Sequence, residues 1–406
     1  MERYDVAVVG AGPAGSVTAY RLARAGASVL LLDRATFPRD KPCGGGLMMR
    51  AVHELPFGVE PVVEQVVDTL RFRLGYGGHY SRASRRPLIL MTQRRKLDEY
   101  LAGKAADAGA AFRDGQRVRE IERRGDGFVV SAGADRIRAS VVVGADGANG
   151  IAGRALDLET PRVNCVALEG NLDHGHAAGR GHDHRAAVLE FGIVPGGYGW
   201  IFPKRDHLNF GVGGWETAGP RLRADLARLC RAHRVDGGEL TELRGHRLPL
   251  RRRGAVAARG RALLVGDAAG LVDPITGDGM FECFVSARRA TDAIADVLDG
   301  RATGVEAYGR RLEQRLAPLV SLSWSAKMAF DRYPGTVFNL TRLPIVWPIV
   351  ERVMWGELEH PGLARGPGRI PLKLVQTLSR LARLPRSAAA TSGAGARASA
   401  VKAGGS

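Results

Sequence analysis

The sequence has few cysteines, few aromatic residues and no long apolar run. Its four cysteines are far apart along 406 residues, so neither a disulfide scaffold nor a thiolate metal site built on CxxC is expected. No stretch reaches the ~18 uninterrupted apolar residues of a membrane-spanning helix, and no secretory signal precedes the first apolar run. We therefore expect a cytoplasmic protein, peripheral at the inner face of a membrane.

Charge is distributed unevenly. The formal net charge is +17, from 59 Lys and Arg against 42 Asp and Glu. Residues 360–406 contain no acidic residue at all. Such a balance attracts phosphate groups of lipids or diphosphates. A nucleic-acid partner is not expected, because the basic residues lack interleaved aromatics and any known binding module.

A glycine-rich turn follows the first predicted strand, at 4–9. Gly10, Gly12 and Gly15 form GxGxxG before a predicted helix at 16–25, and a second strand ends at Asp33. The first glycine permits a tight turn, the second lets a pyrophosphate approach the helix N-terminus, and the third allows close packing. Asp33 stands where a carboxylate accepts hydrogen bonds from ribose hydroxyls, and Arg34 follows it. The pattern predicts a Rossmann-type dinucleotide site.

Two later segments repeat a Gly and Asp after a strand: Asp146-Gly147 and Gly266-Asp267. With Arg94 of RxxLD, they resemble the flavoprotein group that shares the aromatic-hydroxylase fold. That resemblance implies bound FAD, with Asp267 on its ribityl or ribose hydroxyls and Arg94 near its pyrophosphate. The two Asp residues could instead serve only as turn or N-cap residues.

A Pro- and Gly-rich loop precedes the late helix, predicted from Gly277 to about Leu298. The N–H groups around Gly277 and Gly279, with the helix dipole behind them, suit the negative charge of a reduced isoalloxazine.

The loop at 36–50 carries Cys43 followed by three glycines, Gly44, Gly45 and Gly46. These glycines leave room for a flat ring or a lipid against the backbone. Nearby Arg39 and Lys41 would favour a thiolate if they are close in space. A small buried thiol is an equally good interpretation of Cys43.

PxxxxCGGG, together with Tyr198-x-Trp200-x-Phe202-Pro203 and a later GxG, resembles the geranylgeranyl reductase family. The resemblance implies an FAD enzyme that saturates carbon–carbon double bonds of polyprenyl chains. It implies a catalytic role for Cys43, with Tyr198 in reserve, and a prenyl site formed by a set of loop and strand residues: Gly45, Gly46, Tyr198, Trp200, Phe202 and Pro203. Ordinary strand packing would explain the aromatic residues equally well. The chain departs from the family at Asp278 and Met280, where relatives often have Glu and Ile.

The implied reaction moves a hydride from reduced flavin to one alkene carbon and a proton to the other. No second GxGxxG is present, so the electron donor should be external, either NADPH or a ferredoxin. The substrate would be a polyprenyl lipid or diphosphate, and Arg39, Lys41 or Lys204 could hold a diphosphate.

Two rival interpretations remain. The first is an FAD-dependent monooxygenase or halogenase, since halogenases carry an aromatic strand close to this one; the CGGG loop speaks against it. The second is metal binding by a histidine cluster, and its residues are Asp173, His174, His176, His182, Asp183 and His184. The Gly- and Ala-rich setting favours an exposed loop over a metal site, so no metal is predicted.

The expected organisation is an α/β fold in five parts. They are a first FAD-binding part at 1–159, a mainly β substrate domain at 160–255, a second FAD-binding part at 256–300, a helical region at 301–386 and a disordered tail at 387–406. Within the helical region, residues 370–384 form a basic amphipathic segment typical of a helix in a membrane interface. Packing against a domain or a partner would give the same pattern.

Overall fold

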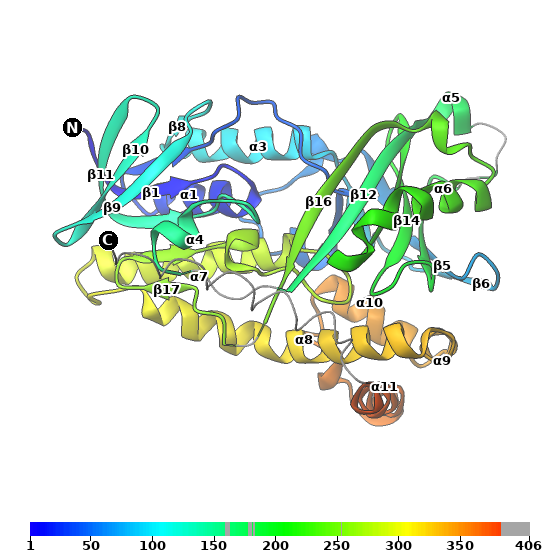
Figure 1. Cartoon of the computed structure of the whole chain (residues 1–406). Coiled ribbons are helices and arrows are strands. Elements are labelled where there is room, and N and C mark those ends of the chain that lie inside the picture. The colour runs from blue at the N-terminus through cyan, green and yellow to red at the C-terminus, as the bar shows by residue number, and fades with distance from the viewer. Residues whose placement is uncertain (159–162, 178–180, 182, 253, 383–406) are drawn as a thin grey trace, which may run out of the picture.

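The computed structural model describes residues 1–158, 163–177, 181, 183–252 and 254–382. In this part of the chain two large sheets lie next to each other, and helices run beneath both (Figure 1). The expected fold class is confirmed: a Rossmann-type sheet, a mainly β second part and a helical C-terminal region. The predicted disordered tail lies outside the described residues.

The first sheet has a parallel centre in the order β18-β11-β1-β2-β8, extended by antiparallel strands at β10 and β17. Val6 of β1 pairs with Val141 and Val29. The paired segments Val6–Val9, Val29–Leu32 and Val141–Val143 are apolar and buried, as expected for a parallel sheet that is covered on both faces. The bounds are β1 Arg3–Val9, β2 Val29–Leu32, β8 Ala111–Arg113, β9 Val118–Arg124, β10 Gly127–Ala132, β11 Asp135–Gly144, β17 Ala258–Arg259 and β18 Ala262–Leu264.

Helix α1 (Pro13–Arg24) starts directly after Gly12 and packs between α3 (Arg94–Asp107) and α7 (Met280–Leu298). The proline at the first helical position has no N–H to leave unbonded. This start places the N-terminus of α1 at the carboxyl end of β1, the edge where open α/β sheets bind their ligands.

The second sheet has the order β16-β12-β15-β14-β13-β5-β6 and is antiparallel except where β13 meets β5. Its bounds are β5 Thr69–Leu74, β6 His79–Ala83, β12 Val163–Asp173, β13 Ala186–Phe191, β14 Tyr198–Pro203, β15 His207–Trp215 and β16 Thr241–Leu250. The expected first FAD-binding part, 1–159, is therefore wrong at β5 and β6, which belong to this sheet. Local periodicity does not reveal which distant strand completes a sheet.

Residues 46–50 were predicted to be part of the loop at 36–50, but together with residues 51 and 52 they form regular secondary structure. They form β3 (Gly46–Met48), which pairs with β7 (Ile89–Met91), and helix α2 (Met49–Val52). β4 (Gln65–Val67) completes this small third sheet. The Gly-rich loop is thus held at its C-terminal end by strand pairing. The remaining short elements are α4 Ala152–Ala155, α5 His174–Ala177 and α6 Leu222–Ala232.

Helix α8 (Glu306–Arg332) connects the two sheets. Its 27 residues span about 40 Å. The Tyr308 hydroxyl donates to the Leu264 carbonyl of the first sheet at 2.7 Å. Farther along, the Lys327 ammonium donates to the Gly196 carbonyl, just before β14. α8 therefore fixes the distance between the two halves of any site formed between the sheets.

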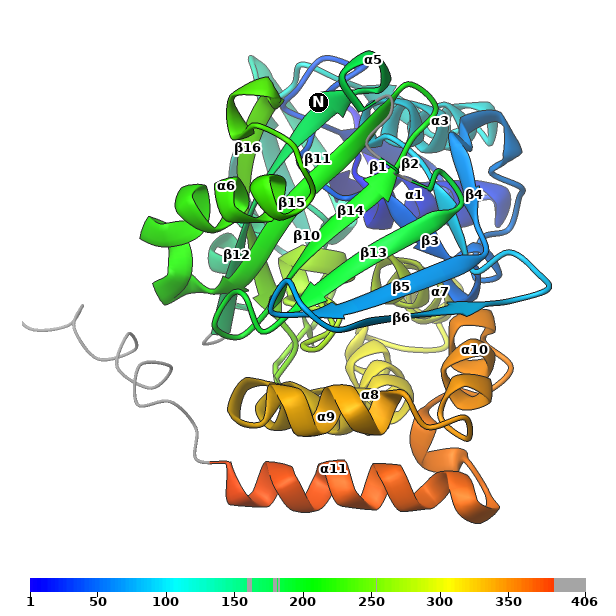
Figure 2. The ribbon, with the colours of Figure 1, turned by 90° about the vertical axis from the view of Figure 1, so that its right-hand side faces the viewer.

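Three more helices follow: α9 (Pro334–Thr341), α10 (Trp347–Trp355) and α11 (Arg369–Leu381). α11 packs along α8 and lies at the lower edge of the molecule, below α8 and α9 (Figure 2). None of the helices in the described ranges combines the length and apolar character required to cross a membrane.

Candidate active site

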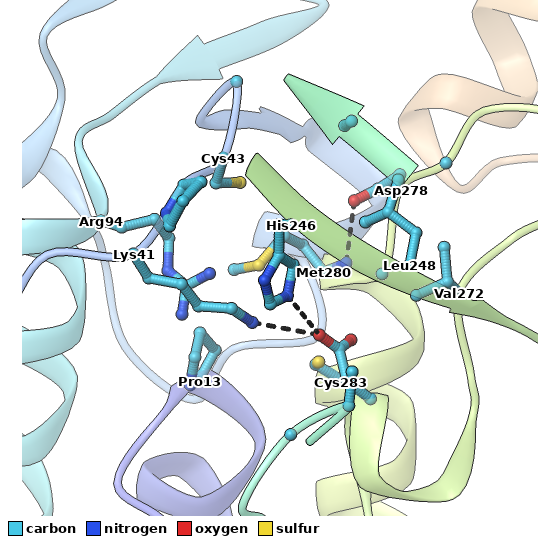
Figure 3. A pocket seen from close by; sticks show the side chains of 18 of the residues that line it. Pro13, Lys41, Cys43, Arg94, His246, Leu248, Val272, Asp278, Met280 and Cys283 are labelled. Carbon is cyan, nitrogen blue, oxygen red and sulfur yellow. Dashed lines mark hydrogen bonds and ion pairs between the residues drawn. The ribbon is translucent and has the colours of Figure 1, made fainter. Parts of the chain in front are cut away.

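A cavity of about 880 Å³ extends between the two sheets and reaches the C-terminal helices. Figure 3 shows its centre, where Pro13, Cys43, His246 and Met280 come from four separate parts of the chain. Most predicted site residues line it: Gly10, Gly12, Asp33, Arg34, Cys43, Gly44, Gly45, Gly46, Arg94, Asp146, Gly147, Tyr198, Trp200, Phe202, Asp267, Gly277 and Gly279. Gly15 and Pro203 do not line it.

The three glycines of GxGxxG differ in what surrounds them. Gly10 has φ +107°, and an added Cβ would meet the Ala145 carbonyl oxygen at 2.3 Å. At Gly15 a Cβ would meet the Gly10 carbonyl oxygen at 1.9 Å, so this glycine acts by packing. Around Gly12 only Arg39 Nη2 lies near, at 3.4 Å. The protein thus leaves room at Gly12 for a ligand to approach the α1 N-terminus.

Asp33 is nearly buried at the end of β2 and holds the glycine loop. Its Oδ2 accepts from the Ala11 N–H at 2.8 Å, and its Oδ1 accepts from the Ala35 N–H at 2.9 Å. Arg34 is exposed at the rim of the cavity.

Arg94 is buried at the start of α3. Its Nε and Nη2 donate to the two oxygens of Asp98 at 2.7 and 2.8 Å. Burial disfavours the charged guanidinium, but the attraction of Asp98 is greater and raises the pKa of Arg94 above its ordinary value. Arg39 of the Gly-rich loop reaches the same Asp98, with Nη2 3.0 Å from Oδ2. A cationic pair therefore stands next to the Gly12 approach, as a pyrophosphate requires.

Asp146 holds the turn that leads into α4, one of the structural roles that we left open for it. Its Oδ2 accepts from the Ile151 and Ala152 N–H groups at 2.6 and 2.9 Å, at the start of α4. The adjacent Gly147 has φ +77° and leaves the cavity side open.

Asp267 faces the centre of the cavity and has two basic neighbours. Its Oδ2 lies 3.0 Å from Lys41 Nζ and 4.0 Å from His246 Nε2 (Figure 3). Burial alone would raise the pKa of Asp267, but Lys41 and His246 more than offset this and hold it well below its usual range. The carboxylate is therefore a permanent acceptor for hydroxyl groups. Gly279 passes close by, since a Cβ there would be 3.1 Å from Asp267 Oδ1.

The Gly-rich loop and β14 are in direct contact. A Cβ on Gly44 would come 2.9 Å from the Phe202 ring and 3.2 Å from Trp200 Nε1. Gly45 has φ +68°, and its Cβ would meet the Thr92 carbonyl oxygen at 2.0 Å. Larger residues would push the loop off the aromatic strand. The two sequence motifs are thus two sides of one contact.

Lys204, the residue after Pro203, locks this contact. Its Nζ donates to the Gly44 carbonyl at 2.6 Å and to the Thr92 carbonyl at 3.0 Å. Burial lowers the pKa of Lys204 to about 8, against the opposing influence of Cys43 and Glu169. Lys204 is therefore a structural cation and not the diphosphate ligand that we considered. The other two candidates also have internal partners, since Arg39 contacts Asp98 and Lys41 contacts Asp267.

The aromatic side chains of β14 alternate with residues of the opposite face. Tyr198, Trp200 and Phe202 line the cavity, whereas Pro203 does not and belongs to the opposite face of the strand. The Trp200 indole N–H donates to Asn209 Oδ1 at 2.8 Å. Gly211 makes room for this ring, because a Cβ there would meet it at 2.0 Å.

The cavity continues beyond these rings as an apolar passage. Its walls come from four elements that the motifs did not identify, and they include Phe72, Phe191, Phe330, Val353 and Met354. The last two belong to α10. Helical periodicity alone could not distinguish these residues from ordinary core.

Glu169 and His246 are functional candidates that we missed. Glu169 Oε1 accepts from the Cys43 N–H at 2.7 Å, and His246 neighbours Asp267. The available signal was a charged or imidazole side chain in the inward register of a strand, for example Glu169 after Cys165 and Ala167.

The histidine cluster does not come together as a ligand set. The His174 and His184 rings are 4.5 Å apart, and His174 Nε2 lies 3.1 Å from the Lys204 carbonyl. Among the described residues, no group of three or more His, Cys, Asp or Glu is arranged to hold a metal. His182 of that prediction lies outside them.

The residues present fit FAD. The open Gly12 backbone, the paired cations Arg39 and Arg94 and the ionised Asp267 all line the same cavity. The sequence from 3 to 320 matches the FAD binding domain family. Because this match covers most of the chain, the protein is an FAD-dependent oxidoreductase of that family.

Similarity to individual proteins narrows the class. The chain is 33% identical to the menaquinone reductase of Mycobacterium tuberculosis, over 86% of this chain and 90% of that one. It is 30% identical to digeranylgeranylglycerophospholipid reductase 1 of Methanopyrus kandleri, over 87% and 100%. A crystal structure of a geranylgeranyl bacteriochlorophyll reductase-like protein from Thermoplasma acidophilum superposes with a TM-score of 0.79 at 21% identity, over 93% and 100%. The chain belongs to the geranylgeranyl reductase family.

Gly12→Val should abolish FAD binding while the protein stays folded, because only the tip of Arg39 lies near the added side chain whereas a pyrophosphate needs that space. Flavin absorbance after incubation with FAD, together with a thermal melt, measures both effects. Gly103→Ala on α3, which has open space around it, is the matched control. A yellow, fully loaded Gly12→Val protein would contradict the assignment of this loop.

Proposed function

We propose that the protein saturates carbon–carbon double bonds of a polyprenyl chain. One observation carries the proposal: a single cavity is lined by the GxGxxG turn, by the CGGG loop and by a set of aromatic and aliphatic side chains from β5, β13, β14, α8 and α10. A long isoprenoid needs such an apolar slot. The names of the relatives, a menaquinone reductase and a digeranylgeranylglycerophospholipid reductase, agree with a substrate that carries a prenyl chain.

The protein's own groups have distinct tasks in this reaction. Gly10, Gly12 and Arg94 hold the dinucleotide, and Asp267 accepts from its hydroxyls. When bound in its reduced form, FAD supplies a hydride for one alkene carbon. The Gly277–Gly279 loop, with α7 behind it, stabilises negative charge at that end of the cavity.

Cys43 is the proposed proton donor to the other alkene carbon. It is half-buried in the cavity wall, and its Sγ accepts a hydrogen bond from the Gly45 N–H at 3.4 Å. That N–H favours the thiolate that remains after proton loss. Tyr198 is less suited to this task. Its hydroxyl donates to the Thr276 carbonyl, and burial raises its pKa well above the usual range.

The substrate would be a polyprenyl lipid or diphosphate, and the electrons would come from an external donor such as NADPH or a ferredoxin. Of the three cations considered for a substrate diphosphate, Lys41 is paired with Asp267 and Lys204 with two backbone carbonyls. Arg39 lies beside Gly12, where it is assigned to the dinucleotide. No cation of the three is left for the substrate, which favours a lipid with an uncharged head.

Anaerobic enzyme reduced with dithionite should add pairs of hydrogens to the prenyl chain of a geranylgeranyl compound, or of a menaquinone whose quinone head is reoxidised before measurement, seen by mass spectrometry as steps of two mass units. Boiled enzyme and oxidised enzyme are the controls. An oxygen-dependent hydroxylated or halogenated product would instead favour the monooxygenase or halogenase alternative.

Cys43→Ser should lower single-turnover alkene reduction at least about 100-fold, as expected for loss of a general acid, without changing the FAD content. Cys230→Ala, which removes a buried thiol of helix α6 outside the cavity, controls for general effects of thiol loss. A Cys43→Ser enzyme with the full single-turnover rate would remove the thiol from the mechanism.

The same proposal includes peripheral contact with the inner face of a membrane. Of ten strongly exposed large apolar side chains in the described chain, six lie between Leu343 and Leu381. On α11, Ile370, Leu374 and Leu381 fall within about 40° of one another at 100° per residue. The basic residues Arg369, Lys373 and Arg380 form a second exposed line beside them. An apolar stripe flanked by cations is typical of a helix in an anionic membrane interface.

Replacing Ile370, Leu374 and Leu381 together by Gln should weaken binding to phosphatidylglycerol vesicles at least tenfold, because each side chain contributes roughly 1 kcal/mol when half-buried in lipid. Vesicle co-sedimentation of the full chain measures this. Val66→Gln removes an equally exposed apolar side chain from β4 and should change nothing. Unchanged binding of the triple variant would refute the contact.

A further inference from the structure

Glu169 is a buried carboxyl in the wall of the active-site cavity. It lies on β12, where Cys165, Ala167 and Glu169 alternate toward the cavity. Glu169 is 9% exposed to solvent. A carboxyl in this position is costly unless it has a partner or is protonated, so its surroundings decide its chemistry.

The first partner of Glu169 is the residue proposed as proton donor. Glu169 Oε1 accepts from the Cys43 N–H at 2.7 Å. In the part of the chain that the structure describes, no donor is bonded to its other oxygen, Oε2. One oxygen therefore fixes the carboxyl to the CGGG loop, and the second is left to carry a proton.

Several charged and titratable groups from four parts of the fold interact with Glu169. They are Asp40 and Cys43 on the loop, Arg94 on α3, Lys204 after β14 and Arg244 on β16. Burial dominates over these groups and raises the pKa of Glu169 to about 7, although the Cys43 N–H and the Lys204 charge act in the opposite direction. At neutral pH the carboxyl exists in both forms, as a proton carrier must.

Lys204 connects the two groups electrostatically. Its ammonium, held by the Gly44 and Thr92 carbonyls, is near both Cys43 and Glu169. With its pKa at about 8, Lys204 is mostly charged at neutral pH. It stabilises whichever of the two neighbours is the anion, and this lowers the cost of moving a proton between them.

We infer that Glu169 returns the proton to Cys43 after each reduction. This inference rests on the proposed function, in which Cys43 gives its proton to the alkene. The Glu169 O–H bond breaks and an S–H bond forms on Cys43, so the negative charge moves from sulfur to the carboxylate. The Cys43 N–H then stabilises that carboxylate until it takes a proton from water. Glu169 is a positioning and proton-supplying residue that acts through Cys43.

Glu169→Gln tests the inference, because the amide oxygen still accepts from the Cys43 N–H but the group no longer carries an acidic proton. Steady-state alkene reduction by wild type should fall as the pH rises through about 7, where Glu169 loses its proton. The variant should be at least tenfold slower at pH 6 and should show no inflection near 7. Glu54→Gln is the matched control. The Glu54 carboxyl lies outside the cavity lining, and its Oε2 is 2.9 Å from Arg288 Nε. This variant should retain the wild-type profile.

A second measurement needs no turnover. The rate of Cys43 alkylation by iodoacetamide, followed by peptide mass spectrometry in the FAD-loaded enzyme, should show two steps with pH in wild type and one step in Glu169→Gln. Identical profiles would overturn the inference, as would a variant that keeps the wild-type turnover profile. If the two-step profile is present while no prenyl compound is reduced, the proposed function fails and the proton exchange between Glu169 and Cys43 is supported.

Discussion

The contact between the CGGG loop and β14 is the constraint on which the rest of the site depends. It joins the sheet that holds the dinucleotide to the sheet that carries the aromatic wall. Gly44 and Gly45 allow an approach that a Cβ would prevent, and Lys204 holds the loop in place through two backbone carbonyls. Because these contacts hold the loop against Trp200 and Phe202, Cys43 is kept in the cavity wall beside the aromatic residues of β14.

The charged side chains in the cavity wall are paired with one another. Arg39 and Arg94 share Asp98, and Lys41 pairs with Asp267. Each pairing keeps a buried charge compensated at moderate cost in a site of low dielectric. Because these basic residues near the loop already have carboxylate partners, they do not form a separate site for a charged headgroup.

The apolar end of the cavity belongs to the helical region as much as to the second sheet. α10 supplies part of the wall, α8 fixes both sheets through Tyr308 and Lys327, and α11 carries exposed apolar residues on the same layer. In the proposed function, the prenyl site and the membrane contact would therefore share the C-terminal helices.

The sequence by itself determined the dinucleotide half of this protein. GxGxxG, Asp33, the RxxLD start and the late GD segment each depend on backbone conformation over a few residues, so local pattern was sufficient, and the aromatic alternation of β14 was equally readable. Only the tertiary structure decided that β5 pairs with β13 in the second sheet, that Lys204 is buried against the CGGG loop and that Glu169 meets Cys43. These depend on contacts between residues more than a hundred positions apart, and pairing energy at such separations leaves no periodic trace in the sequence.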